Sequence, residues 1–380
     1  MRKKKILGLI IAVVLAYVLW LSNGMLRFKT YTLDSPDTNP LEIQGAYHMH
    51  TIYSDGREHP DKIAEYASSA ALDFIILTDH GNPNFECLGS EGWNQGVLVL
   101  AGSEFNVNRG HLVALDIGDG TQPFSGNAEQ VAHQIRALKG LTIIAHPFSK
   151  THWSWGEHVG YSGIEIINAN TMWKMYTLHA IPYLPAALIK PDYALIKMLK
   201  RPEKNLKKWD ELNEISPVYG YFSVDAHLLY RPLLTFLQLH LLLEDPLSSE
   251  FETAKRQVFD ALRKGRFYNA VDTAAEARGF RFWAKTRNRR VLMGSSVPVD
   301  SPVILKAKAP YPFARELRLI HNGDRIFSSS ESEISIETSK PGIYRVEVYL
   351  KEKSALDKNI PWIVSNPIFL REKNHERHRP

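Results

Sequence analysis

The chain has 380 residues, of which 44% are hydrophobic and 23% are charged, and its formal net charge is +5. These values are ordinary for a globular protein, and the length allows two domains. The single cysteine, Cys87, excludes an intrachain disulfide. The basic residues are widely spread, which is weak support for nucleic-acid binding and is compatible with an anionic substrate or a lipid surface.

The N-terminus predicts a membrane-spanning helix. Residues 2–5 are basic, and residues 6–26 carry no charge. As a helix with a rise of ~1.5 Å per residue, residues 6–26 are about 31 Å long, close to the ~30 Å hydrocarbon core of a bilayer. The basic flank favours a cytoplasmic N-terminus, with the rest of the chain on the extracytoplasmic or periplasmic side. A cleaved signal peptide is the alternative, but no clear cleavage site follows, so we expect residues 1–26 to form an uncleaved signal anchor.

After a polar spacer at 27–42, short apolar runs alternate with helical patterns. Helices are predicted at 59–72 and 126–139, and strands at 43–50, 73–80, 97–107, 111–117, 141–147, 163–168 and 219–227. Apolar strands that alternate with helices are typical of a parallel sheet covered on both faces. Seven or eight such units favour a barrel, and the fold class is therefore predicted to be α/β, with the barrel domain at 43–278.

The pattern changes near residue 279. Runs such as "VILKAKA" and "YRVEVYL" alternate polar and apolar residues with a period of two, and Gly, Pro, Ser and Asn separate them. Asn322-Gly323 is a typical hairpin turn. The pattern predicts an Ig-like β-sandwich domain at 279–371, followed by a polar tail at 372–380.

Histidines and acids recur where the predicted strands of the barrel end. In "AYHMHTIYSDG", His48 and His50 close the first strand, and Asp55 follows in the next loop. Because side chains alternate along a strand, His48 and His50 are expected to point the same way, toward the rim where barrel active sites form. Two convergent nitrogen ligands and an oxygen ligand from a loop favour a metal site.

The other predicted strands add further candidates of the same kind. A lone histidine at a strand end is more often an ordinary surface or core residue, so the weight lies in the coincidence. Buried acids and histidines are costly unless they are paired or bound to metal, which favours a metal centre. The candidate ligands are His48, His50, Asp55, His80, Glu104, His111, His146, Asp225 and His227.

This order of ligands resembles the metal site of the PHP (polymerase and histidinol phosphatase) domain, over residues of about 43–275. The segments "ALRKGRFYNAVDT" (261–273), "GFRFWA" (279–284) and "PWIVSNPIFLR" (361–371) are similar to the exported CehA/McbA-like branch of PHP metallohydrolases. The resemblance implies a distorted (β/α)7 barrel that holds two or three divalent ions.

The resemblance also implies how the ligands divide among the ions. His48, His50, Glu104 and Asp225 would hold one ion. Asp55, His80 and His227 would hold a second. Glu104, His111 and His146 would hold a third, with Glu104 as a bridge.

The charges predict the substrate. Three carboxylates do not neutralise two or three divalent ions, so the site attracts an anion, and phosphate oxygens can bridge metals. A metal-bound water has its pKa lowered from 15.7 to about 7, so a hydroxide is available for in-line attack on a phosphoester. Nitrogen and oxygen ligands without thiolate suit Mn, Fe or Zn better than Mg or Ca. We therefore expect a di- or trinuclear hydrolase, a phosphoesterase, acting on a small anionic substrate.

Four further residues are weaker candidates. Arg109 could bind a phosphate oxygen, Asn168 could face the mouth of the barrel, and His179 could act as a general acid or contact the substrate. Asp79 could orient His80, or it could instead have a role in a cap or turn. The apolar and then basic segment 176–209 fits a lid, an element resting on the membrane, or a helical insertion packed on the barrel.

Two other functions remain open at this point. The same metals could hydrolyse a carboxylic ester or a carbamate, which the branch resemblance allows. Alternatively, the chain could be a non-catalytic binding protein that grips its partner with the β-sandwich. A nucleic-acid substrate is not expected, because no platform of aromatic residues interleaved with basic residues is visible.

Overall fold

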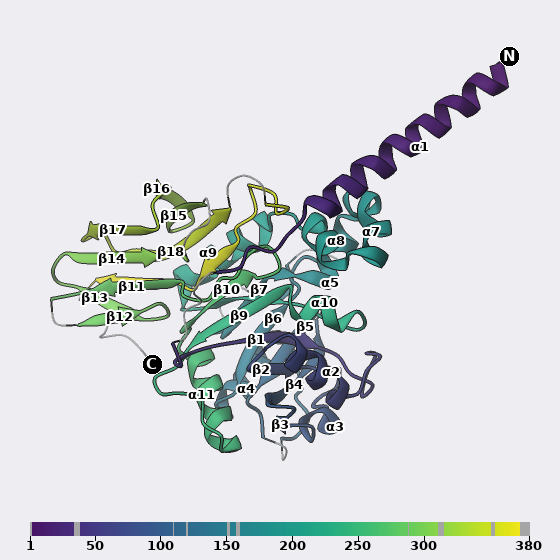
Figure 1. Cartoon of the computed structure of the whole chain (residues 1–380). Coiled ribbons are helices and arrows are strands. Elements are labelled where there is room, and N and C mark those ends of the chain that lie inside the picture. Colours follow the sequence, from purple (N-terminus) through teal and green to yellow (C-terminus); the bar gives the residue numbers. More distant parts are fainter. Residues whose placement is uncertain are drawn as a thin grey trace.

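The computed structural model describes residues 2–33, 39–108, 110–118, 121–149, 153–156, 160–287, 289–310, 315–350 and 354–372 (Figure 1). The helices are α1 (Arg2–Arg27), α2 (Pro60–Ser69), α3 (Phe85–Leu88), α4 (Ala128–Ala137), α5 (Ala169–Met175), α6 (Thr177–Ala180), the 3-10 helix η1 (Ile181–Tyr183), α7 (Leu184–Ile189), α8 (Pro191–Met198), α9 (Glu203–Ile215), α10 (Tyr230–Leu234) and α11 (Phe251–Arg263).

The strands follow the same numbering. They are β1 (Glu42–Met49), β2 (Phe74–Leu77), β3 (Gly92–Asn94), β4 (Val97–Val107), β5 (Gly110–Leu115), β6 (Leu141–Ala145), β7 (Gly163–Asn168), β8 (Tyr219–Ser223), β9 (Leu237–Leu242), β10 (Phe267–Val271), β11 (Arg281–Lys285), β12 (Arg290–Leu292), β13 (Ser296–Val299), β14 (Val303–Lys308), β15 (Arg315–His321), β16 (Asp324–Ser329), β17 (Glu333–Thr338), β18 (Gly342–Leu350), β19 (Ile363–Ser365) and β20 (Ile368–Glu372).

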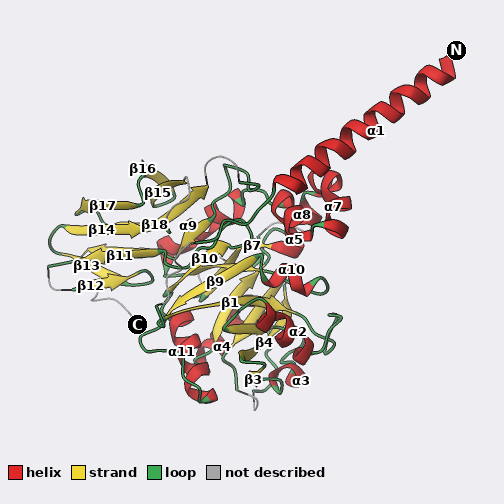
Figure 2. Cartoon of the chain, viewed as in Figure 1, coloured by secondary structure: helices red, strands yellow, loops and turns green. Residues whose placement is uncertain are grey.

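The fold is mixed α/β, with a large sheet and a smaller one (Figure 2). The large sheet has 16 strands, and its main path runs β13-β20-β18-β19-β10-β9-β1-β2-β4-β5-β6-β7-β8. The smaller sheet has four strands in the order β12-β11-β14-β17. Helices α2 and α4 form where apolar residues recur with helical spacing. In α2, Pro60 is the first residue, and Ile63, Ala64 and Ala67 are buried.

The large sheet is not purely parallel, which corrects the expectation from the alternating pattern. β4 and β5 form an antiparallel pair, and β5 is also antiparallel to β6. The chain passes from Val107 to Gly110 with only two intervening residues, which is too short for a helical crossover. The sequence did not predict β9 and β10. β9 is antiparallel to β1, and β10 is antiparallel to β9.

The end of the β1–β8 strand path lies against its beginning. β7 pairs with β8 in parallel, and the residues after β8 bond to β1. Val224 donates its backbone N–H to Tyr47, Ala226 donates to His48, and His50 donates to Ala226, over 2.9–3.2 Å. Residues 47–50 and 224–226 are therefore fixed to each other, although they are far apart in the sequence.

The C-terminal strands continue the large sheet across the expected boundary at residues 278 and 279. β10 pairs with β19 at Tyr268–Ser365 and Ala270–Ile363. The hairpin turn predicted at Asn322-Gly323 joins β15 to β16, and both of its residues have positive φ, 50° and 87°. The polar tail at 373–380 lies outside the described residues.

The segment 176–209 is helical. It forms α6, η1, α7, α8 and the first half of α9, and α7 and α8 lie beside the C-terminal end of α1 (Figure 1). α1 is a single apolar helix that extends away from the rest of the chain in Figure 1. Its segment Lys3–Arg27 is long and apolar enough to cross a membrane, and only 6% of its most apolar stretch of 18 residues is buried. Such a helix is compatible with a membrane anchor and with a signal sequence.

A buried ionic network joins β1, β9, β10 and β11. The Glu42 carboxylate lies 3.4 Å from His240 Nδ1 and 2.5 Å from an Arg281 guanidinium nitrogen, and it accepts a hydrogen bond from the Tyr268 hydroxyl. His240 Nε2 lies 2.9 Å from Asp272. Burial by itself raises the pKa of Glu42, but His240, Arg281 and Tyr268 outweigh it and lower that pKa to about 2. Burial lowers the pKa of His240, but Asp272 and Glu42 raise it to about 9.

These pKa shifts predict how stability depends on pH. The contribution of His240 is fully present below its ordinary pKa of 6.5 and is lost as the pH rises through about 9. The contribution of Glu42 is present above 4.5 and is lost as the pH falls through about 2. We expect His240→Gln to destabilise the chain by about 3–5 kcal/mol at pH 6, because it leaves buried carboxylates without their partner, and by less at pH 10. Chemical unfolding at both pH values measures this, with the exposed His133→Gln as control. A loss that is equal at both pH values would contradict the prediction.

Candidate metal centre

The end of β1 presents two histidines through a distortion of the strand. His48 has a φ of 72°, and the register with β2 shifts between Tyr47 and Met49. A positive φ is costly for a residue with a side chain, by about 1–3 kcal/mol, and occurs mainly where neighbours enforce it. The two rings nevertheless meet, with 3.2 Å between His48 Nε2 and His50 Nε2. Their convergence therefore depends on this distortion and not on simple alternation along the strand.

Glu104, in the middle of β4, is the centre of the histidine cluster. Its carboxylate is 1% exposed. One oxygen lies 3.2 Å from His48 Nε2 and from His50 Nε2, and 3.5 Å from His80 Nδ1. The other oxygen lies 2.7 Å from His111 Nδ1 and 2.9 Å from His146 Nε2.

The hairpin of β4 and β5 explains the position of His111. His111 is the second residue of β5 and pairs with Asn106 on β4 and with Ala145 at the end of β6. Because β5 runs opposite to its neighbours, its first residues lie at the same edge of the sheet as the last residues of β6. His146 follows directly after β6, with a φ of 28°.

Asp225 and His227 reach the cluster from the segment that pairs with β1. Asp225 has a φ of 48° and is 4% exposed. Its carboxylate lies 3.5–3.7 Å from His50, His48 and His227. His227 Nε2 lies 3.2 Å from Asp55, and the His227 ring stacks on His50 with centroids 4.2 Å apart.

Asp79 holds the loop that carries Asp55. Its carboxylate accepts hydrogen bonds from the Thr51 backbone N–H (2.7 Å), the Thr51 hydroxyl (2.8 Å) and the Ser54 hydroxyl (2.5 Å). Of the two roles considered for Asp79, these contacts favour the one in a turn. Asp55 itself is exposed, with 54% of its side chain accessible, and it faces His50, His80 and His227 at 3.2–3.8 Å.

The nine candidate ligands therefore lie together. Three groups have donor atoms within 4.8 Å of one another: His48, His50 and Glu104; His50, Asp55, His80 and His227; and His80, Glu104 and His111. The first group contains three residues of the first expected set, and the second contains the whole second expected set plus His50. In the third group His80 takes the place of His146, which contacts the same Glu104 oxygen as His111.

Glu165 belongs to this cluster and was missed in the sequence. It lies on β7, fully buried, with one oxygen 2.5 Å from His48 Nδ1. Its other oxygen accepts hydrogen bonds from the His146 backbone N–H (2.7 Å) and the Asn168 side chain (2.8 Å). The available signal was an acid at an inward position of the otherwise apolar strand "GIEIIN", because such an acid needs a buried partner.

The three other site candidates have different outcomes. Asn168 is buried, binds Glu165 and caps α5 by accepting from the Thr171 backbone N–H, so its side chain lies next to the cluster. His179 lies on α6, where its ring packs at 6.0 Å against Tyr183, and it contacts none of the nine ligands within the described part of the chain. Arg109 lies outside the described residues.

Within the described part of the chain, histidines alone balance the charges of the cluster. Among the described residues, no lysine or arginine pairs with Glu104, Glu165 or Asp225. Burial by itself raises the pKa of Glu104, but His48 and the hydrogen bonds of its other histidines lower it well below the usual range. Burial lowers the pKa of His50, but Asp225 and Glu104 raise it to about 9. Without a cation, protons on the imidazoles supply the positive charge that the carboxylates require.

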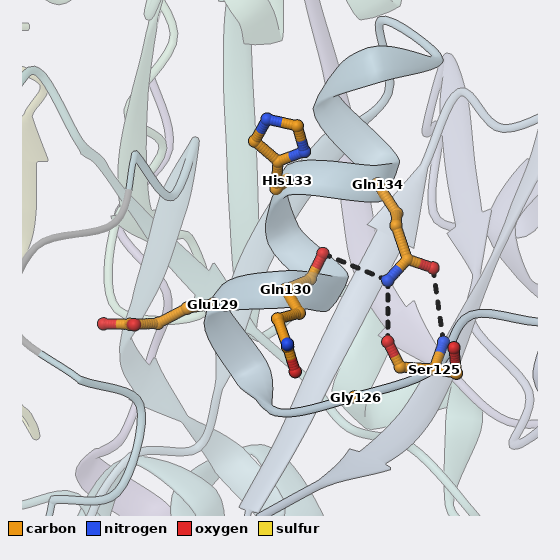
Figure 3. A pocket seen from close by; sticks show the side chains of 6 residues that line it. All are labelled: Ser125, Gly126, Glu129, Gln130, His133 and Gln134. Carbon is orange, nitrogen blue, oxygen red and sulfur yellow. Dashed lines mark hydrogen bonds between the residues drawn. The ribbon is translucent and has the colours of Figure 1, made fainter.

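A surface hollow elsewhere on the chain is a different feature. It has a volume of about 600 Å³ and lies over α4, lined by Ser125, Gly126, Glu129, Gln130, His133 and Gln134 (Figure 3). The Gln134 amide bonds to the backbone of Ser125 and Gln130, so its polar atoms are already paired. The hollow offers one histidine, His133, and one carboxylate, Glu129, which are fewer ligands than the groups around Glu104 provide.

Comparisons with known proteins give distant structural likenesses. No protein-family model and no curated protein matches the chain. A two-domain protein from Bacteroides vulgatus that contains a predicted PHP-like metal-dependent phosphoesterase is 14% identical, with a TM-score of 0.46 over 89% of this chain and 99% of that chain. A protein from Bifidobacterium adolescentis described as a metal-dependent phosphoesterase is 13% identical, with a TM-score of 0.33 over 56% and 95%. An amidohydrolase from Chromobacterium violaceum, with sulfate and no metal, is 15% identical, with a TM-score of 0.31 over 48% and 87%.

The contacts of Asp79 predict a measurable effect on the loop at 51–56. We expect Asp79→Ala to destabilise the chain by about 1–3 kcal/mol, because the buried Thr51 N–H loses its acceptor. We also expect faster amide hydrogen exchange in the loop. Asp61→Ala, on the exposed first turn of α2, is the control and should leave the amide exchange of the loop unchanged. Unaltered exchange at 51–56 in Asp79→Ala would show that Asp79 does not hold the loop.

Proposed function

We propose that this chain is a metal-dependent phosphoesterase of the PHP type, related to the CehA/McbA-like branch, anchored in a membrane and exposed on its extracytoplasmic side. The observation that carries the proposal is the convergence of nine nitrogen and oxygen donors from segments spread over residues 48–227 around the Glu104 carboxylate. Glu104 would bridge ions, since its two oxygens face different histidines.

The donor set fits two or three divalent cations. Among the described residues, only imidazoles balance the charge of the buried carboxylates. Such a site can exchange the protons of its imidazoles for metal ions, because histidine and carboxylate bind metals in their deprotonated forms. The donors are nitrogen and oxygen without thiolate, which favours Mn, Fe or Zn. The closing of the β1–β8 strand path supports the barrel that the PHP resemblance implies, since residues 224–226 bond to 47–50.

The protein's own residues have separate tasks in this reaction. Divalent cations bound at this site would polarise a phosphoester and activate water. The positive φ of His48, His146 and Asp225 aims three donors inward from strand ends. Asp79 fixes the loop of Asp55, and Glu165 holds Nδ1 of His48 so that Nε2 faces Glu104. Asp55 is exposed, so the edge of the cluster at Asp55, His80 and His227 is the side open to substrate.

Metal content and substrate turnover test the proposal together. We expect the full chain, purified with Mn, to retain about two or three ions and to hydrolyse aryl phosphoesters. The double variant His48→Ala with His50→Ala should lose both the metal and the activity, because these two rings would bind the same ion as Glu104. Mass-spectrometric metal analysis beside a panel of phosphoesters and aryl carboxylic esters measures this, with His133→Ala as the surface control.

Each outcome of this experiment is informative. Fewer than about one ion per chain in the wild type would contradict the metal centre and favour a binding protein. Retained metal with hydrolysis of carboxylic esters alone would contradict the phosphoesterase and leave the metal centre in place.

The position of Glu165 predicts an effect on metal affinity. We expect Glu165→Gln to weaken Mn binding by about 10–100-fold, because the amide neither carries the charge nor fixes the tautomer of His48 as the carboxylate does. Calorimetric titration measures the affinity, and Glu86→Gln, on the exposed surface of α3, is the matched control. An unchanged affinity in Glu165→Gln would show that Glu165 is only a packing residue.

A further inference from the structure

An apolar surface covers the helices α5 to α7. Residues 177–189 form a short apolar helical run. Leu178, Leu188 and Ile189 have 87%, 92% and 74% of their surface exposed. We call these residues the insertion face, together with the exposed Trp173, Met175, Ile181 and Leu184. Large apolar side chains gathered in this way are unusual on a protein surrounded by water and mark an interaction surface.

The insertion face is attached to α1 by specific contacts. The Tyr17 hydroxyl donates to the Pro182 carbonyl over 2.9 Å, and the rings of Trp20 and Tyr183 lie 5.5 Å apart. The Lys190 ammonium donates to the carbonyls of Met25 and Phe28, both over 2.9 Å. The segment that carries the insertion face is thus held along the last part of α1, from residue 17, and at residue 28 just after α1.

This attachment sets the depth of the insertion face relative to α1. Residues 17–26 make up the last part of the expected span, about 15 Å of helix at ~1.5 Å per residue. A bilayer leaflet contributes half of a ~30 Å core, so the contacts at Tyr17 and Trp20 fall within the outer leaflet if residues 6–26 span it. The contacts of Pro182 and Tyr183 with α1 therefore place the neighbouring insertion face at the depth of the same leaflet.

A basic cavity lies next to η1 and α8. It has a volume of about 350 Å³ and is lined in part by Tyr183, which also contacts Trp20 of α1, and by His179. Lys197, Lys200 and Arg201 contribute positive charge, and Asp357 is the acid in the lining. Arg201 is already paired with Glu203 and Glu347. Lys200 has no ion-pair partner among the described residues, so the cavity suits an anionic group next to lipid.

We propose that the insertion face is buried in the outer leaflet beside α1, and that the basic cavity holds the head group of an anionic phospholipid. The proposal rests on the membrane anchoring proposed above. It assigns His179, expected in the catalytic site, to the lipid cavity. It also places α5, which begins directly after Asn168 at the edge of the metal cluster, against the membrane surface.

Spin labels measure the depth of the insertion face in a way that does not depend on activity. The full chain is placed in phospholipid vesicles with a nitroxide on Leu188→Cys, on Val14→Cys of α1, or on Leu138→Cys at the end of α4. Native Cys87 is fully buried, and wild type gives the background. We expect Leu188→Cys to resemble Val14→Cys, with high collision rates with oxygen and low rates with a nickel chelate. Leu138→Cys should report water.

The outcomes separate the two proposals. If Val14→Cys reports lipid and Leu188→Cys reports water, the insertion face is not in the membrane although the anchor is. If both report water, α1 does not span the bilayer, and the anchor fails together with the insertion face.

Native mass spectrometry of the full chain in detergent tests the cavity. We expect wild type to retain phosphatidylglycerol severalfold better than phosphatidylcholine. Lys200→Gln should lose most of this preference, whereas Lys207→Gln, an exposed lysine on α9, should keep it. Equal retention of the two lipids by wild type, or an unchanged preference in Lys200→Gln, would show that the cavity is not a head-group site.

Discussion

The carboxylate of Glu104 is the constraint on which the candidate site depends. It is almost completely buried, and five imidazoles surround it at 2.7–3.5 Å. A buried carboxylate is tolerated only when positive charge reaches it, from protonated histidines or from cations. Glu104 therefore couples the ends of β1, β2, β6 and the start of β5, and the geometry of these strand ends is tied to the chemistry of the cluster.

Three residues of the cluster also carry backbone strain. His48, His146 and Asp225 all have positive φ, a conformation that residues with side chains rarely adopt. The pairing of residues 47–50 with 224–226, together with the Glu165 bonds to His48 and to the His146 N–H, holds this strain. Strained residues that persist at a polar cluster are typical of a functional site, and here they turn three donors toward one point.

The molecule also joins its parts through buried polar groups. The Glu42 network connects β1 with β9, β10 and β11, and β19 pairs with β10, so the C-terminal strands share hydrogen bonds with the sheet that carries the site. At the other end, Tyr17 and Trp20 of α1 contact η1, and Lys190, between α7 and α8, donates to the Met25 carbonyl. The sheet that carries the proposed metal centre is thus bonded to the C-terminal strands.

The sequence alone determined the local patterns: the apolar helix at the N-terminus, most strands of the first half and the Asn322-Gly323 turn. It also placed eight histidines and acids beside the ends of predicted strands, and it gave His111 as a ninth candidate ligand. These follow from periodicity and turn chemistry, which act over a few residues. The antiparallel direction of β5 follows from the two-residue connection between Val107 and Gly110, which the apolar pattern alone does not reveal. Only tertiary structure decided that β9 and β10 extend the sheet, and that Glu165 completes the cluster while His179 lies elsewhere. Side-chain encounters such as that of His48 with Glu165 join residues more than a hundred positions apart, and no local pattern encodes them.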